Sequence, residues 1–325
     1  MNAVLRRILP VMLLGVLVYG VFVIYTGYHA ISESLVHFNW WTFALALGLA
    51  CVNYAFRFCK WQFYLRVLEI RGIAVLDSLL IFLSGFVLTI TPGKVGEVFK
   101  SAVMQRTHSV PAERTAPIVV AERLTDLIAI VILIVCTSST LSDGLLWPAL
   151  GSVAIACGFV VIYWRAPAEW LFRREGPKLS KIMPKLRKAY EQLQVLSSPS
   201  RLLLPVFLSV LAWAAEGLAL HTLLMGFDQS ATVPQALFFY STATLAGALI
   251  PIPGGLGITE TLMREQLVRV ANVALGAATA SMLLVRFATL WWAVLVGFAA
   301  LALLRLRFGE LSRGDVLPAP PAPTP

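Results

Sequence analysis

The sequence has few charged residues for its length. Only 13% of its 325 residues are Asp, Glu, Lys or Arg, and 58% are hydrophobic. Soluble domains carry about 25% charged residues, so the composition argues against a soluble globular protein and indicates several membrane-spanning segments. The net charge of +9 therefore indicates basic cytoplasmic loops beside anionic lipid, and we expect no nucleic-acid partner.

Cysteine and histidine are also scarce, with four of each. The cysteines form no CxxC pair and show no metal-ligand spacing, which argues against a disulfide framework or a zinc site. The sequence also lacks a P-loop, a GxSxG elbow and an HExxH helix. It therefore predicts no metal, no cofactor, and no ATP-driven work by this chain alone.

Two Pro-Gly breaks within apolar runs organise the rest of the chain. Proline removes a backbone donor and glycine loosens the backbone, so each break interrupts a helix at membrane depth. Each is followed roughly 30 residues later by an arginine in an apolar helix. Paired breaks of this kind indicate a transport or binding site. The residues of the breaks are Pro92, Gly93, Gly96, Pro253, Gly254, Gly255 and Gly257.

The segments around the breaks are short for a membrane crossing, which needs about 20 residues. Basic residues flank the first segment on both sides, with Arg71 before it and Arg106 after it. A re-entrant hairpin over 76–106, entering from the cytoplasm, keeps both flanks inside. A second hairpin, over 235–269, then enters from outside. The alternative is that every arm crosses fully, which gives ten spans with the same location of the termini.

The remaining apolar runs predict six full spans, and the fold class is an all-α polytopic membrane protein with an inverted-topology repeat. The segment 165–201 holds nine Lys and Arg residues and is predicted to be a cytoplasmic linker with one interfacial helix. The membrane domain covers 1–310, and the proline-rich tail, 311–325, is expected to be disordered. The predicted spans are 8–27, 40–59, 115–136, 145–164, 202–225 and 273–304, with Arg57 and Lys60 at the cytoplasmic end of the second.

Three charged residues lie inside the third predicted span: Glu122, Arg123 and Asp126. At 100° per residue all three fit on one quarter of the helix surface. A charge at this depth costs several kcal/mol unless it has an ionic partner or contacts water. We therefore interpret a charged residue inside the membrane as functional. The alternative is an ion pair that locks this helix to a neighbour.

Lys94, Glu97 and Lys100 follow the first Pro-Gly, and their spacing of three places them on one face of a short helix. The start of that helix would expose free N–H groups suited to a phosphate. The alternative is that Lys94 and Lys100 extend to the cytoplasmic headgroups.

Three more charged residues lie in apolar segments of the second half: Glu216, Glu260 and Arg286. Glu216 is expected to face the interior, as the partner of an arginine or as a protonatable relay. Arg286 needs either an acidic partner or a phosphate. The glycines before Glu260 allow close approach of a ligand, or equally of another helix.

These residues together resemble a known family. The motifs PGKVGE at 92–97, ERLTD at 122–126 and PIPGGLG at 251–257, followed by Glu260 and Arg286, are similar to those of the lysylphosphatidylglycerol synthase transmembrane-region family. This flippase-like module also forms the N-terminal half of the multiple peptide resistance factor. The resemblance implies a bacterial or archaeal cytoplasmic-membrane protein. The synthase domain of the two-part relatives is not present in this sequence.

We therefore expect a translocator of a phospholipid or lipid-linked anionic substrate, with both termini in the cytoplasm. Lys94, Arg123 and Arg286 would hold the phosphate, and the acidic residues would pair with them or with an amino group. Two alternatives are a membrane-embedded transferase acting on a polyprenyl-phosphate sugar, with Glu97 or Glu122 as the base, and a scaffold for a lipid-biosynthetic enzyme that docks on 165–201.

Overall fold

The computed structural model describes residues 17–25, 28–91, 97–138, 146–164, 183–250 and 252–309. All regular structure within these ranges is helical. Lys94, Pro92, Gly93 and Gly96 lie outside the described residues, as do residues 165–182 of the predicted linker and the tail 311–325.

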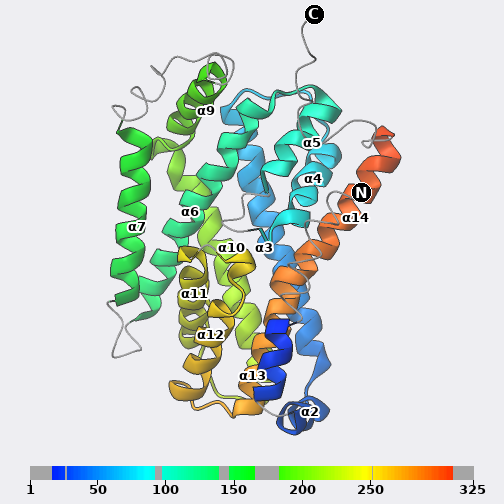
Figure 1. Cartoon of the computed structure of the whole chain (residues 1–325), viewed down its shortest axis with the longest axis vertical. Coiled ribbons are helices and arrows are strands. Elements are labelled where there is room, and N and C mark those ends of the chain that lie inside the picture. The colour runs from blue at the N-terminus through cyan, green and yellow to red at the C-terminus, as the bar shows by residue number, and fades with distance from the viewer. Residues whose placement is uncertain are drawn as a thin grey trace, which may run out of the picture.

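The first half of the chain contains a long helix, a broken hairpin and a second long helix. From one end of the molecule, α4 and η1 run to its middle, and α5 returns to the same end (Figure 1). The predicted hairpin 76–106 thus matches the observed helices within a few residues. The elements are α2 (Tyr28–Val36), α3 (Trp40–Val67), α4 (Val75–Ser84), the 3₁₀ helix η1 (Gly85–Leu88), α5 (Phe99–His108) and α6 (Ala112–Ser138).

The second half repeats this order in the opposite direction. From the other end of the molecule, α11 runs to the middle and α12 returns, while α13, η4 and α14 form one continuous rod (Figure 1). Thr232 and Gln235 cap the start of α11 reciprocally. The elements are α10 (Pro199–Gly226), α11 (Val233–Leu249), the 3₁₀ turn η3 (Pro253–Gly255), α12 (Ile258–Arg269), α13 (Leu275–Arg286), the π-helical η4 (Phe287–Trp291) and α14 (Trp292–Phe308).

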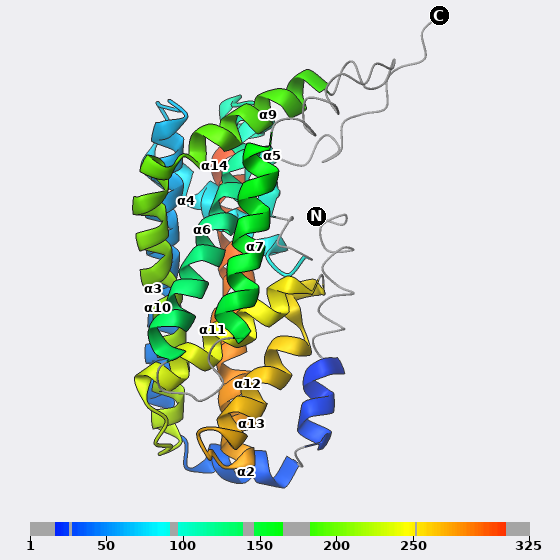
Figure 2. The ribbon, with the colours of Figure 1, turned by 90° about the vertical axis from the view of Figure 1, so that its left-hand side faces the viewer.

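In the part of the chain that the structure describes, two further helices connect the halves. α7 (Leu146–Tyr163) packs against α6 and returns the chain to the end where α9 (Met183–Leu196) lies. Figure 2 shows α9 across that end of the bundle, where it packs against α6. α9 lies within the segment 165–201, for which the sequence predicts one helix.

The helices confirm an all-α polytopic membrane protein. Within the described residues, three are long and apolar enough to cross a membrane: Trp40–Val67, Pro199–Gly226 and Leu275–Phe308. The 27 residues of α6 measure about 40 Å at ~1.5 Å per residue. Its charged residues make α6 less apolar than these three helices. α3 continues to Val67, eight residues beyond the predicted end near Cys59. Lys60 therefore lies within the helix and not at its end.

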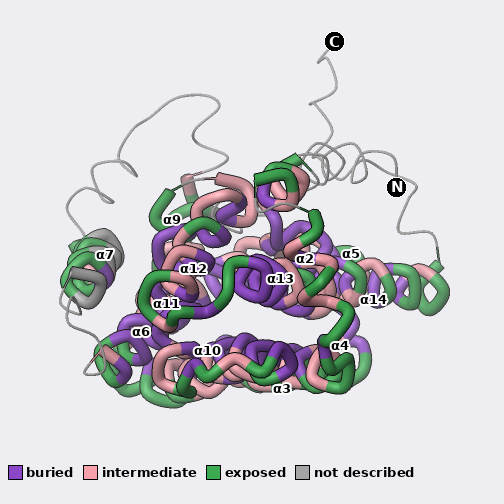
Figure 3. Tube along the Cα trace, turned by 90° about the horizontal axis from the view of Figure 1, so that it is seen from below, coloured by how far each residue is buried: buried purple, intermediate pink, exposed green. Residues whose placement is uncertain are grey.

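Several helix contacts join the two halves. α3 and α10 lie side by side along one face, and α14 packs against α4 and η1 (Figure 3). At Gly297 in α14, an added Cβ would lie 2.6 Å from the backbone nitrogen of Val87. Glycine is therefore required there for the rod of the second half to reach the hairpin of the first.

Replacing Gly297 by alanine tests this contact. We expect a cost of about 1–3 kcal/mol from overpacking, because the atom that Cβ meets is backbone and cannot rotate away. The matched control is Gly48→Ala in α3, where nothing lies within 4 Å of the added Cβ. Thermal unfolding in detergent should show a lower melting temperature for Gly297→Ala only. Equal melting temperatures for the two variants would refute the close contact.

Candidate functional site

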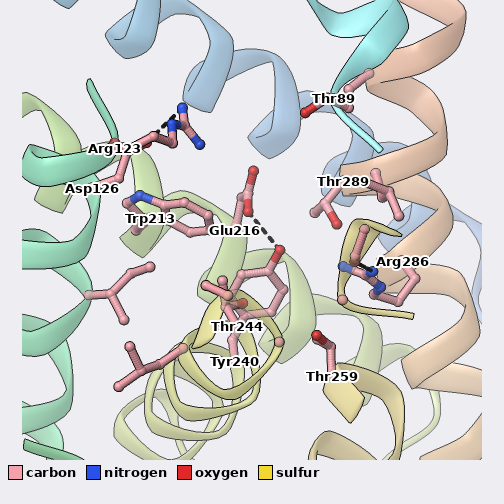
Figure 4. A pocket seen from close by; sticks show the side chains of 18 of the residues that line it. Thr89, Arg123, Asp126, Trp213, Glu216, Tyr240, Thr244, Thr259, Arg286 and Thr289 are labelled. Atoms are coloured by element: carbon pink, nitrogen blue, oxygen red, sulfur yellow. Dashed lines mark hydrogen bonds and ion pairs between the residues drawn. The ribbon is translucent and has the colours of Figure 1, made fainter. Parts of the chain in front are cut away.

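A cavity of about 300 Å³ lies where the two hairpins meet (Figure 4). Thr89 and Thr91 line it from the first hairpin, and Gly254 and Gly255 from the second. Its walls come from α3, α6, α10, α11 and the junction of α13 with η4. Three arginines and two acids line it: Arg57, Arg123, Arg286, Asp126 and Glu216. The rest of the lining is mostly apolar, a combination typical of ligand sites.

Two arginines bind the first hairpin at Glu97. Arg57 Nη2 from α3 donates to both carboxylate oxygens of Glu97, at 3.2 and 3.3 Å. Arg123 Nη2 from α6 donates to Oε2 at 3.2 Å, and the Thr89 hydroxyl donates to Oε1 at 3.2 Å. Since Glu97 is buried, its charge needs these donors. The second arm of the hairpin is thereby tied to both long helices of the first half.

A buried lysine, Lys60, contacts Asp126, which in turn contacts Arg123 at the cavity wall. Lys60 Nζ lies 2.6 Å from Asp126 Oδ1 and 2.7 Å from Ser209 Oγ, and its exposed fraction is 0%. Asp126 Oδ2 in turn lies 3.0 Å from Arg123 Nη2. Because Asp126 is held by a buried cation, its carboxylate orients Arg123 at the cavity wall.

One arginine binds the second hairpin. Arg286 Nε from α13 donates to Glu260 Oε1 at 2.6 Å, and its Nη2 donates to the Gly254 carbonyl at 2.6 Å. Glu260 Oε2 accepts from the Gly257 backbone N–H at 2.7 Å. Gly254, Gly255 and Gly257 have φ between +62° and +89°, the left-handed region that favours glycine.

The two hairpins are thus bound by equivalent pairs. Arg123 and Glu97 are 26 residues apart, and so are Arg286 and Glu260. In each half, the arginine of the helix that follows a hairpin binds the glutamate of that hairpin's second arm. η4 begins directly after Arg286, and π-helical turns of this kind are frequent at functional sites.

Glu216 lies between the two pairs, on α10. Its Oε2 accepts a hydrogen bond of 2.6 Å from the Tyr240 hydroxyl of α11, and Figure 4 shows both side chains at the centre of the cavity. Trp213 lies one turn earlier on α10 and lines the same space. The prediction that Glu216 faces the interior agrees with this position.

Glu122 and Lys100 form a separate pair away from the cavity. Lys100 Nζ lies 2.6 Å from Glu122 Oε2 and over the Trp61 ring at 4.6 Å from its centroid. Both side chains are buried. The extension of Lys100 to the headgroups is therefore wrong, because an acidic partner lies within reach inside the protein. For Glu122 the structure favours the alternative of an ion pair that locks two helices.

The sequence analysis missed Arg57 and Lys60 as site residues and placed them in the cytoplasmic flank. Both are buried, because α3 continues for two more turns beyond Cys59. The residues after Lys60 are Trp61, Gln62, Phe63, Tyr64 and Leu65, and this apolar continuation was the signal available. Tyr240 gave no signal, since a tyrosine in an apolar helix is ordinary.

Within the described ranges, His, Cys, Asp and Glu side chains gather in no group of three or more that could hold a metal ion. A family model described as "Lysylphosphatidylglycerol synthase TM region" matches residues 12–297. The matched range includes both hairpins and every charged residue of the cavity. Comparison with curated proteins gave no match to the chain.

Proposed function

The chain belongs to the family of the lysylphosphatidylglycerol synthase TM region, and on this premise we propose that it moves a lipid with an anionic phosphate headgroup between membrane leaflets. The observation that carries the proposal is the cavity between the hairpins, with three arginines on its wall. An apolar wall beside charged donors suits a lipid headgroup and the start of its tails.

Arg123 is the arginine best placed to receive a phosphate. Its side chain is 24% exposed, against 8% for Arg57 and for Arg286. A phosphate oxygen would replace Glu97 Oε2 as the acceptor of Arg123 Nη2, and arginine binds phosphate through two parallel hydrogen bonds. Lys94 precedes Glu97 by three residues and would add a further positive charge.

We propose that both hairpins are re-entrant. The arms of the first, α4 and α5, have 10 residues each, about half of the ~20 needed to cross. Each hairpin keeps to one half of the molecule (Figure 1). An unpaired backbone at the breaks is tolerated in a membrane when a wet cavity satisfies it.

The orientation follows from the basic helix ends. α3, α5 and α14 all have basic residues in their last turns, and these turns lie at the end of the molecule that holds α9 (Figure 1). By the positive-inside rule this end is cytoplasmic, which supports two cytoplasmic termini in a bacterial or archaeal cytoplasmic membrane. The opposite directions of the two halves support rocking between inward and outward access.

The transferase alternative is less well supported. Its candidate bases are Glu97 and Glu122, and each forms an ion pair with a buried cation. Neither lines the cavity, so neither is placed to activate a substrate hydroxyl. The scaffold alternative rests on 165–201, of which the structure describes only part.

The test is translocation of fluorescent phosphatidylglycerol in reconstituted vesicles. We expect Arg123→Ala and Arg286→Ala each to lower the rate about tenfold or more, since a charged hydrogen bond contributes roughly 1.5–3 kcal/mol. The matched control is Arg269→Ala, because the Arg269 side chain is 79% exposed. If both folded cavity variants transport at the wild-type rate, the function is refuted.

A further inference from the structure

The first turn of α12 borders the cavity with backbone donors that no described residue uses. Gly254 and Gly255, just before the helix, and Thr259, its second residue, all line the cavity. The N–H groups in the first turn of an α-helix have no acceptor within that helix. At α12, none of the described residues accepts a hydrogen bond from the N–H groups of Ile258, Thr259 and Glu260. These three donors therefore remain available beside the cavity.

The Thr259 side chain adds an independent donor at the same place. It is 3% exposed, and within the described part of the chain nothing forms a hydrogen bond with its hydroxyl. Figure 4 shows this hydroxyl turned toward the cavity. By contrast, the hydroxyl of Thr289 in the same wall donates to the Val285 carbonyl, one turn earlier. Since buried hydroxyls have partners in the large majority of cases, the hydroxyl of Thr259 points to a ligand.

Two glycines keep the space beside this hydroxyl open. An added Cβ on Gly255 would lie 2.7 Å from Thr259 Oγ1, and one on Gly247 would collide with the same oxygen. Both glycines line the cavity. A side chain at either position would therefore cover the hydroxyl and exclude a ligand atom from it.

Arg286 positions these donors through the bonds that it already makes. Its Nε donates to Glu260, and its Nη2 donates to the Gly254 carbonyl. The arginine thus holds the loop before α12 against the start of the helix. It also compensates the charge of Glu260, so that carboxylate does not oppose an anion there. What faces an anion is then the positive end of the helix dipole.

We propose that the first turn of α12 and the Thr259 hydroxyl form an oxyanion subsite that binds the phosphoryl group of the substrate on the second-hairpin side of the cavity. Helix N-termini bind phosphate through such N–H groups and through the dipole. The donors of this subsite are neutral, whereas the first-hairpin side presents the guanidinium of Arg123. The subsite rests on the proposed function, because it assigns where the second half of the chain contacts the headgroup.

Binding to the detergent-purified full-length protein tests the hydroxyl, with dioctanoyl phosphatidylglycerol and inorganic phosphate as separate probes. Thr259→Val keeps the branched shape and removes the hydroxyl. It should weaken binding of both probes about tenfold, the fold-change of one hydrogen bond to a charged group. Thr259→Ser keeps a hydroxyl and should restore most of the lost affinity. The matched control is Thr261→Val, because the exposed Thr261 hydroxyl donates to the Gly257 carbonyl.

Hydrogen exchange tests the backbone donors in the wild type itself. Saturating dioctanoyl phosphatidylglycerol should slow exchange of the amides of 258–260, because a bound oxyanion accepts from them. Dioctanoylglycerol, which has the same tails and no phosphate, should leave their exchange unchanged. A purely structural role of Thr259 would produce no protection that depends on the phosphate.

The outcomes separate the subsite from the proposed function. If the lipid binds but leaves the amides of 258–260 unprotected, or if folded Thr259→Val binds both probes as wild type does, the subsite is refuted and the translocator function stands. If inorganic phosphate binds as tightly as the lipid and Thr259→Val weakens both, the subsite stands and the lipid substrate is refuted. If wild type binds neither probe, the anion-binding cavity fails, and the subsite with it.

Discussion

Replacing Lys60 by methionine should destabilise the protein by about 3–5 kcal/mol, because it leaves a buried carboxylate without its main cation. Asp126 would lose the partner at 2.6 Å and keep Arg123 at 3.0 Å and the Ser209 hydroxyl. For a chain of this size the cost corresponds to a fall of roughly 10 °C in melting temperature. Thermal unfolding in detergent measures it.

Two further variants test whether the loss of stability in Lys60→Met comes from the carboxylate of Asp126 that it leaves without Lys60. Adding Asp126→Asn to Lys60→Met should recover much of the lost stability, since the uncompensated charge is then removed. Lys188→Met, at an exposed position of α9, should leave the melting temperature unchanged. If Lys60→Met melts at the wild-type temperature, the buried pair of Lys60 with Asp126 is contradicted. Lys60 would then lie in the cytoplasmic flank, as the sequence predicted.

The hairpin boundaries could be predicted because they depend on local signals. Proline and glycine interrupt a helix wherever they occur, and run length limits what can cross a membrane. The predicted hairpins 76–106 and 235–269 accordingly fall close to Val75–His108 and Val233–Arg269. The all-α membrane class followed from composition for the same reason.

The pairing of charges could not be predicted, since it depends on contacts between distant segments. The rule that basic residues mark cytoplasmic ends counts charge alone. It placed Lys60 at the cytoplasmic end of the second span, although Asp126, 66 residues later, is its partner. Glu122 and Arg123 are adjacent, yet they bind Lys100 and Glu97 respectively. Sequence spacing places such residues near one face but does not choose among partners.

The second large effect is expected at the pair that binds the second hairpin. Arg286→Met leaves Glu260, whose exposed fraction is 0%, without its cation and the Gly254 carbonyl without the donor at 2.6 Å. The expected cost is again about 3–5 kcal/mol. Glu260→Gln should recover part of it in the double variant. Melting temperatures of the wild type, both single variants and the double variant yield the coupling energy of the pair.

The control is the double-mutant cycle of Arg123 and Glu97 in the first half, because Glu97 has a second arginine partner. When Arg123 is replaced by methionine, Glu97 still has both hydrogen bonds from Arg57, at 3.2 and 3.3 Å. Arg286 is the cation bonded to Glu260 among the described residues. The coupling of Arg123 with Glu97 should therefore be smaller than that of Arg286 with Glu260. Equal couplings would show that the two halves hold their hairpins alike. Arg123 is also the more exposed of these two cavity arginines, at 24% against 8% for Arg286. The first hairpin is therefore the one that we expect a bound phosphate to release.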